Sequence, residues 1–238
     1  MRYLVLSDIH SNVEALEACC GRAKEAGYDA VLCCGDLVGY GPEPNEVIGI
    51  VQGLNALCIR GNHDRVAAGL DNADDFNPYA RAATYWTRDQ LTDAHREYLA
   101  GLPMGPLEVT PESQLVHGGL TDEDDYIFTD LDAADNFLLT EVSITFFGHT
   151  HFQVVYDRAQ RFNSPEEFVI DPASQILVNP GSVGQPRDGD PRAGFLIWDV
   201  EKSRLEFYRV EYPVTRTQKK MREAELPSYL IDRLTVGR

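Results

Sequence analysis

Short runs of apolar residues recur along the chain, and most of them stop at glycine or at a polar residue. The main runs occupy residues 3–6, 30–34, 54–59, 115–116, 144–147 and 176–178. Continuous apolar runs of this length are typical of strands that are buried on both faces. Between the early runs, apolar residues recur at helical spacing over residues 12–24 and again over 46–52. This alternation predicts βαβ units with a mixed or parallel sheet.

Residues 65–113 interrupt that rhythm. The pattern predicts a helix over residues 78–90, followed by a shorter helix that Thr92 or Asp93 caps and that ends near residue 102. We interpret residues 65–113 as a helical insertion that flanks the functional site. Because no linker or repeat divides the chain, we take residues 1–238 as one domain.

After residue 151 the pattern becomes one of antiparallel strands. The predicted elements are strands at 152–156 and 168–170 around a polar loop, a hairpin of 193–199 and 205–211, and two short helices within 214–234. The chain is therefore predicted to be an α/β domain with a helical insertion.

Charge and composition narrow the classes of partner. Lys and Arg total 21 against 38 Asp and Glu, a formal net charge of −17. Such a surface argues against a broad nucleic-acid or membrane interface, although a local positive field still allows a small anionic substrate. No apolar run has the length of a membrane span, and the five cysteines lack a metal-binding spacing. These features predict buried, reduced cysteines and a cytoplasmic location.

Five of the six histidines follow directly on apolar runs, and two aspartates and an asparagine occupy equivalent positions. The set consists of Asp8, His10, Asp36, Asn62, His63, His117, His149 and His151. Ligands of open α/β sheets bind at the carboxyl ends of the strands, so these side chains are expected to converge. The Asp8/His10 and His149/His151 pairs each have two-residue spacing, which in extended backbone places both members on one side.

Imidazole nitrogens mixed with carboxylate and amide oxygens suit Mn²⁺, Fe, Co²⁺ or Zn²⁺ better than Ca²⁺ or Mg²⁺. The candidates are too many for one tetrahedral ion, but they suffice for two ions that share a carboxylate. Asp36 is the predicted bridge. A two-metal centre can clamp both a phosphoryl group and an attacking hydroxide, and it would supply the positive field that the acidic surface lacks.

Five strings carry a family resemblance: D-I-H at 8–10, G-D-L-V-G at 35–39, G-N-H-D at 61–64, H-G-G at 117–119 and G-H-T-H at 148–151. In order and spacing they resemble the signature of the calcineurin-like metallophosphoesterases. Two further strings, G-Y-G-P at 39–42 and N-P-G-S-V-G-Q-P-R at 179–187, resemble a bacterial and archaeal branch of small phosphodiesterases that is sometimes labelled diadenosine-tetraphosphatase-like. The resemblance implies a four-layer α-β-β-α sandwich of two mixed sheets.

The resemblance also implies a role for each matching residue. One metal would be held by Asp8, His10, Asp36 and His151, and the second by Asp36, Asn62, His117 and His149. His63 would face the leaving group as general acid, oriented by Asp64. No ligand position departs from the family pattern.

Two further residues are candidates for substrate binding. Arg187 follows a loop rich in glycine and proline, where a guanidinium group can hold a phosphate, but an ordinary surface arginine fits equally well. Asn12 is placed either to contact substrate or to cap the first predicted helix.

The predicted function is that of a binuclear metal-dependent phosphoesterase, in which a metal-bridging hydroxide attacks phosphorus and His63 protonates the departing oxygen. A phosphodiesterase or nucleotide hydrolase with a small substrate is preferred. Two alternatives remain open: a protein serine/threonine phosphatase, and a metal-binding scaffold without catalysis. Scaffold relatives lose the leaving-group histidine, whereas this chain has His63. The sequence leaves the oligomeric state open.

Overall fold

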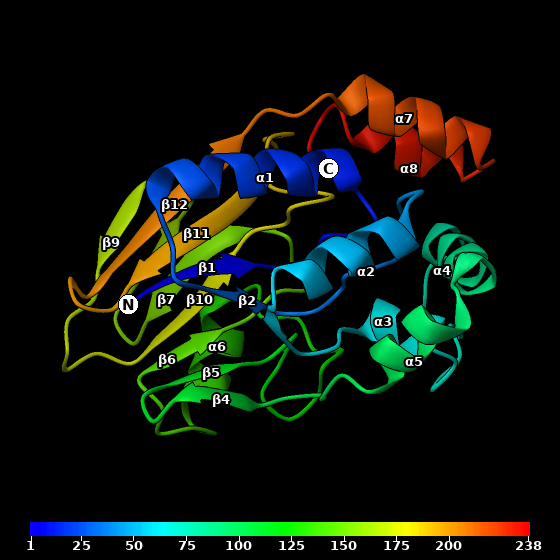
Figure 1. Ribbon diagram of the computed structural model, residues 1–238. Coiled ribbons are helices and arrows are strands. Elements are labelled where there is room, and N and C mark those ends of the chain that lie inside the picture. Colours follow the sequence, from blue (N-terminus) through cyan, green and yellow to red (C-terminus); the bar gives the residue numbers. More distant parts are fainter.

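Two mixed β-sheets of six strands each form the centre of the computed structural model, which describes all 238 residues (Figure 1). The first sheet has the order β3 (Leu57–Cys58), β2 (Ala30–Cys33), β1 (Arg2–Leu6), β11 (Ala193–Asp199), β12 (Arg204–Val210) and β9 (Glu167–Val169). The second has the order β4 (Leu107–Thr110), β5 (Ser113–Leu115), β6 (Ile144–Phe146), β10 (Ile176–Pro180), β7 (Gln153–Asp157) and β8 (Arg161–Asn163).

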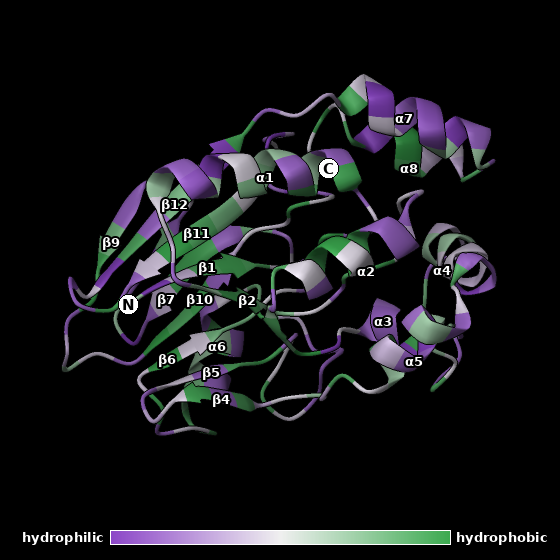
Figure 2. Cartoon of the chain, in the orientation of Figure 1, coloured by the Kyte–Doolittle hydropathy of each residue, from purple (hydrophilic) through white to green (hydrophobic).

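Eight helices surround the sheets. They are α1 (Val13–Ala26), α2 (Pro44–Gly53), α3 (Asn62–Ala67), α4 (Pro78–Gln90), α5 (Asp93–Ala100), α6 (Asp130–Phe137), α7 (Val214–Glu223) and α8 (Ser228–Arg233). None of them is both long enough and apolar enough to span a bilayer. Hydrophobic residues concentrate along the inner strands, whereas α7 is largely hydrophilic (Figure 2).

The side chains of β1 alternate between two separate cores. Leu4 and Leu6 pack with Leu16 of α1, whereas Val5 lies between the two sheets together with Leu196 of β11. Because successive side chains of a strand point to opposite faces, one short apolar run supplies both cores.

Strand β10 does the same in the second sheet. Ile176 and Val178 face the core between the sheets, whereas Leu177 packs on the outer face with Ala133 and Phe137 of α6. The order of layers is therefore helix, sheet, sheet, helix. The predicted α-β-β-α sandwich of two mixed sheets is confirmed.

Each sheet contributes three parallel strands. Strands β1, β2 and β3 run parallel in the first sheet, and β5, β6 and β10 run parallel in the second. The carboxyl ends of parallel strands share one edge of a sheet. The two sheets therefore present six strand ends from which loops can build a site.

Several elements differ from those that the sequence pattern predicts. The interrupted stretch at 65–113 does hold α4 and α5, but its residues 107–110 form the edge strand β4 of the second sheet. The predicted polar loop after β7 contains a further short strand, β8. Edge strands such as these are short and half exposed, so their apolar pattern is weak.

Gln153 joins the two sheets where they meet. Its Nε2 donates to the carbonyl oxygens of Pro180 at 3.0 Å, Phe195 at 3.3 Å and Tyr208 at 3.0 Å, and its Oε1 accepts from Arg209 Nε at 2.8 Å. The side chain is 3% exposed. One amide thus satisfies backbone groups of both sheets in a region that water hardly reaches.

We expect Gln153→Leu to lower the free energy of unfolding by about 1–3 kcal/mol, because it removes a buried amide that bonds three backbone carbonyls and Arg209. Urea unfolding followed by circular dichroism measures the change. The matched control is Gln160→Leu, whose side chain is exposed and which should change stability by less than about 0.5 kcal/mol. Equal stability of the two variants would contradict this role for Gln153.

Candidate metal centre and substrate cavity

The side chains singled out in the sequence meet at the carboxyl ends of the parallel strands. Asp8 and His10 follow β1, Asp36 follows β2, and His149 and His151 follow β6. All five have positive φ angles, between 48° and 64°. Residues other than glycine rarely adopt this conformation, and where they do, it often marks a functional site.

This backbone corrects one expectation. The two-residue spacing of His149 and His151 was expected to place both rings on one side, as in extended backbone. Because of the positive φ angles, the two rings point into different, neighbouring groups of side chains. His151 lies beside Asp8 and His10, whereas His149 lies beside Asp36 and His117.

The first group is formed by Asp8, His10 and His151, all of them buried. His10 Nε2 and His151 Nε2 are 3.1 Å apart, and Asp8 Oδ1 lies 3.4 Å from His151 Nε2 and 3.9 Å from His10 Nε2. Asp8 is held in place by Ser7 Oγ, at 2.7 Å, and by the His149 amide, at 3.1 Å.

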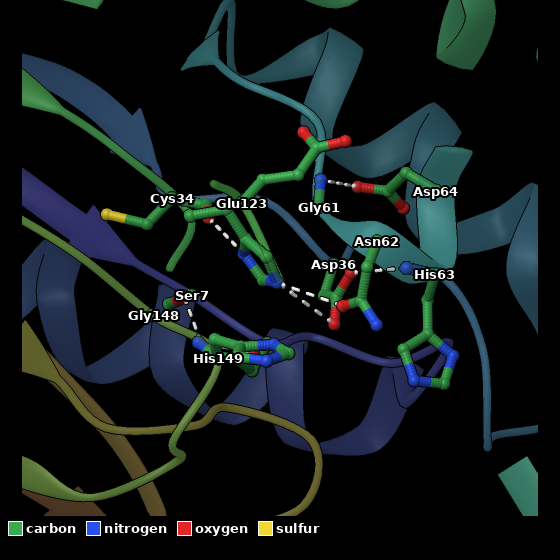
Figure 3. Close-up of polar contacts among 12 residues, drawn as sticks. Ser7, Cys34, Asp36, Gly61, Asn62, His63, Asp64, Glu123, Gly148 and His149 are labelled. Atoms are coloured by element: carbon green, nitrogen blue, oxygen red, sulfur yellow. Dashed lines mark hydrogen bonds and ion pairs between the residues drawn. The ribbon is translucent and has the colours of Figure 1, made fainter. Parts of the chain in front are cut away.

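The second group is formed by Asp36, His117 and His149. Asn62 lies beside Asp36 (Figure 3). His117 Nε2 lies 3.4 Å from Asp36 Oδ2 and 3.2 Å from Asn62 Oδ1. The same Asp36 oxygen is 3.6 Å from His10 Nε2 of the first group. Asp36 therefore stands between the two groups, which is the position expected of a bridging ligand.

Backbone carbonyls fix the tautomer of every histidine in the two groups. Nδ1 of His10, His117 and His151 lies 3.0, 2.7 and 2.5 Å from the carbonyl oxygens of Val38, Cys34 and Gln185. For His149 the roles are reversed, with Nε2 at 3.1 Å from the carbonyl oxygen of Asp124. A carbonyl can only accept, so each of these nitrogens carries the hydrogen, and in the neutral form of the ring the other nitrogen presents its lone pair.

The donor set therefore fits divalent cations. In the neutral rings of His10 and His151, no hydrogen can lie between the two Nε2 atoms, which nevertheless face each other at 3.1 Å. A cation ligated by both lone pairs relieves this contact, and a ligating histidine usually donates its other N–H to a carbonyl or carboxylate.

Burial keeps most of these rings neutral. It lowers the pKa of His149 to about 3 and pushes the pKa values of His10 and His151 well below the ordinary value. His117 is the exception: burial opposes its charged form, but the Asp36 carboxylate outweighs burial and raises the pKa of His117 to about 10. Burial raises the pKa of Asp8 to about 7, and Asp36 adds to this rise. Neutral imidazole is the form that binds metal.

His63 lies beside the two groups without joining them. Its amide donates to Asp36 Oδ1 at 2.9 Å (Figure 3), its Nδ1 is 2.9 Å from Thr84 Oγ1 of α4, and its Nε2 has no partner within the chain. Thr84 Oγ1 in turn donates to the carbonyl oxygen of Ala80 at 2.9 Å, so it accepts from His63 Nδ1. Burial lowers the pKa of His63 to about 4.

The structure corrects the expected role of Asp64. Its carboxylate accepts from the amides of Gly61, Leu37 and Val38 at 3.0–3.2 Å and makes no hydrogen bond to the His63 ring (Figure 3). Asp64 therefore fastens the loop that follows β2 to the start of α3. The hydroxyl of Thr84, in a stretch whose pattern indicated only a helix, orients the ring instead.

A cavity of about 710 Å³ opens beside both groups. Its charged lining consists of Asp36, Asp71, Asp74, Asp75, Asp122, Asp124, Arg65 and Arg187, in addition to histidines. Six carboxylates thus face two guanidinium groups. The acidic loop around residues 122–124 is tied to α3, because Arg65 Nη2 binds Asp124 at 2.7 Å and Arg65 also pairs with the buried Glu123.

The two candidates for substrate binding, Arg187 and Asn12, differ in whether they line the cavity. Arg187 lines the cavity and lies against Tyr40, with Nη2 3.2 Å from the Tyr40 hydroxyl. Asn12 is 1% exposed and does not line this cavity. Its Oδ1 caps α1 by accepting from Ala15 N at 3.1 Å, and its Nδ2 donates to the carbonyl oxygen of Gly184 at 2.9 Å. The helix-capping interpretation of Asn12 therefore holds, whereas a contact between Asn12 and substrate stays a prediction.

Two aromatic residues at the site were assigned no role from the sequence. The Tyr126 ring lies 4.0 Å from the His149 ring, and the Tyr40 ring lies 4.4 Å from the His63 ring. Tyr40 belongs to the G-Y-G-P string, but the resemblance that this string carries assigns no role to the ring.

Comparisons with known proteins agree with this geometry. The sequence model described as the calcineurin-like phosphoesterase superfamily domain matches residues 1–203. An uncharacterized protein of Methanocaldococcus jannaschii is 34% identical over 240 residues, covering 98% of this chain and 97% of that protein. The crystal structure of a metallophosphoesterase from Sphaerobacter thermophilus is 38% identical with a TM-score of 0.90, covering 100% of this chain and 99% of that one.

A hypothetical protein from Pyrococcus horikoshii shares the fold at 22% identity, with a TM-score of 0.82 over 100% of this chain and 98% of that one. The family model covers all five strings that carried the resemblance, and two full-length relatives exceed 30% identity. The family prediction is confirmed: the chain belongs to the calcineurin-like phosphoesterase superfamily, a metal-dependent family of phosphoric ester hydrolases.

Proposed function

We propose that this chain is a binuclear metal-dependent phosphodiesterase that acts on small phosphodiesters or nucleotides. One observation carries the proposal: four imidazoles, each with one N–H tied to a backbone carbonyl, direct their second ring nitrogens at two buried carboxylates. Such a concentration of lone pairs and negative charge away from water is costly unless cations neutralise it.

The two ligand sets in this proposal share Asp36. Asp8, His10, Asp36 and His151 would hold one ion, and Asp36, Asn62, His117 and His149 the other. Divalent Mn, Fe, Co or Zn ions fit this mixed set of nitrogen and oxygen donors. When bound, the two ions would polarise the phosphoryl oxygens and supply an activated water as nucleophile.

His63 is the proposed general acid. Its Nδ1–H is held by Thr84, so protonation at Nε2 produces an imidazolium whose second N–H has no partner in the protein. An anionic phosphoryl group beside the ring favours this charged form and raises its pKa. The Nε2 proton can then pass to the departing oxygen.

The cavity favours a diester over a monoester. Asp36 would be neutralised as a metal ligand, but five further carboxylates against two guanidinium groups disfavour a phosphomonoester dianion more strongly than a diester monoanion. The same charge disfavours the phosphorylated side chains that a protein serine/threonine phosphatase must accept. A diester also places a group on each side of phosphorus, which an open cavity of about 710 Å³ can accommodate.

The metal requirement is tested by elemental analysis after loading with Mn²⁺. We expect about two ions per chain, and we expect chelation to abolish diester hydrolysis. His10→Gln should lower the metal content. His95→Gln should not, because His95 lies outside both groups and forms a hydrogen bond with Asn45 near the start of α2. Full activity after exhaustive chelation would contradict the proposal, and two bound ions without hydrolysis of any ester would favour the scaffold alternative.

The role of His63 is tested with esters that differ in leaving group. General-acid catalysis contributes about 10²–10⁴-fold, mostly for a poor leaving group such as an alkoxide. His63→Ala should keep both metals and lose far more kcat on alkyl diesters than on nitrophenyl diesters. Asp36→Asn should weaken metal binding and slow both substrates alike. Equal losses on both esters in a fully metallated His63→Ala protein would remove His63 from the acid role.

Thr84 offers a sharper version of this test. Thr84→Val keeps the shape of the side chain but leaves His63 Nδ1 without an acceptor, so we expect a loss of about tenfold in kcat on alkyl diesters and a smaller one on nitrophenyl diesters. The matched control is Thr87→Val, on the same buried face of α4, because Thr87 Oγ1 has no hydrogen-bond partner. If the two variants behave alike, Thr84 does not position the ring.

A further inference from the structure

A second, smaller hollow adjoins the cavity beside the candidate metal centre. Its volume is about 390 Å³, and its lining includes Tyr40, Tyr79, Tyr126, Tyr229, Arg187 and Arg233. No carboxylate lines it, although aspartates line the main cavity. We call it the side pocket. Its aromatic and cationic lining suits a flat, electron-rich ring and not a metal or a sugar alone.

The side pocket is continuous with the candidate metal centre. Tyr40, Tyr126 and Arg187 line both hollows. The Tyr40 ring lies 4.5 Å from the His10 ring, and the Tyr126 ring lies 4.0 Å from the His149 ring. A molecule with its phosphoryl group at the histidines therefore reaches the side pocket with its neighbouring group.

Three tyrosines of the side pocket are open to solvent. Tyr79, Tyr126 and Tyr229 are 47%, 47% and 52% exposed. The Tyr79 and Tyr229 rings stack on each other, with centroids 4.9 Å apart at 24°, and Arg233 lies over the Tyr229 ring. Single exposed aromatics are common on protein surfaces, but here several converge on one hollow beside a reactive centre.

Helix α8 supplies part of this lining and lies outside the matched family region. Tyr229 and Arg233 come after residue 203, where the family match ends. The helix is held in place by Leu230 and Ile231, which pack with Tyr40 in one hydrophobic cluster. In Figure 1, α8 lies beneath α7 at the end of the molecule that also carries α4. The C-terminal helices thus add a wall to a centre that the rest of the fold builds.

We propose that the side pocket binds the base of a nucleoside that is esterified to the phosphoryl group, with the stacked pair of Tyr79 and Tyr229 as the aromatic wall that the base contacts. This proposal rests on the proposed function, because it places the phosphodiester at the metal centre. Stacking of a base on an aromatic side chain strengthens binding about five- to 150-fold and tolerates any base, since every base has a π-face. The chain would then discriminate nucleoside diesters from simple alkyl diesters.

The test compares two diesters with the same leaving group, thymidine 5′-(4-nitrophenyl phosphate) and methyl 4-nitrophenyl phosphate, on the Mn²⁺-loaded full chain. The wild type should prefer the nucleoside ester at least fivefold in kcat/KM. Tyr229→Ala should bring this ratio towards one, and Tyr229→Phe should restore it. Arg222→Ala, at an exposed position of α7 outside the side pocket, is the control and should leave the ratio unchanged.

Binding provides a readout that does not depend on hydrolysis. Calorimetry should give a lower Kd for adenosine 5′-monophosphate than for ribose 5-phosphate, and Tyr229→Ala should remove the difference. Equal Kd values in the wild type, or a difference that survives Tyr229→Ala, would overturn the side-pocket proposal. Failure to hydrolyse either diester would overturn the proposed function instead. The ratio of the Kd values for adenosine 5′-monophosphate and ribose 5-phosphate would then still show whether the side pocket binds a base.

Discussion

The structure depends on a constraint of charge and burial: two carboxylates and four imidazoles share a volume that is almost closed to water. Asp8, Asp36, His10, His117 and His151 are each at most 1% exposed. Unpaired groups of this kind would normally be driven apart or take up protons. They stay together because each is held by neighbouring backbone groups, and because cations can complete the set.

The two sheets supply the rigidity that this constraint requires. The parallel strands end at one place, and the loops after them turn sharply through positive φ angles at Asp8, Asp36 and His149. Close approach of the loops needs glycine at Gly39 in particular, which has φ +92° and where a Cβ would collide with His63. Strained loops of this kind persist when the surrounding packing fixes them, as the two buried cores do here.

Around this fixed centre, the parts that determine substrate choice come from other elements. Helix α4 contributes Thr84 behind His63, and α4 and α8 contribute Tyr79 and Tyr229 to the side pocket. The acidic residues of the main cavity and the guanidinium of Arg187 set its charge. The chemistry thus resides at the strand ends, whereas selectivity depends on helices that pack against one another at the rim.

The sequence by itself determined the family, the layered α/β architecture and the convergence of the polar residues. Apolar runs that end in D-x-H, G-N-H-D or G-H-T-H consist of residues that are neighbours in the chain, so they can be recognised without the tertiary structure. Contacts between distant segments could not be predicted in this way. Asp64 and Thr84 lie 20 residues apart, and only the position of α4 decides that the threonine, not the neighbouring aspartate, holds His63. Likewise, the sequence suggests a helix cap for Asn12, but its hydrogen bond to the carbonyl oxygen of Gly184, 172 residues further along the chain, is visible only in the structure. Side-chain partners of this kind depend on where helices and loops dock, and docking is fixed by packing across the whole molecule.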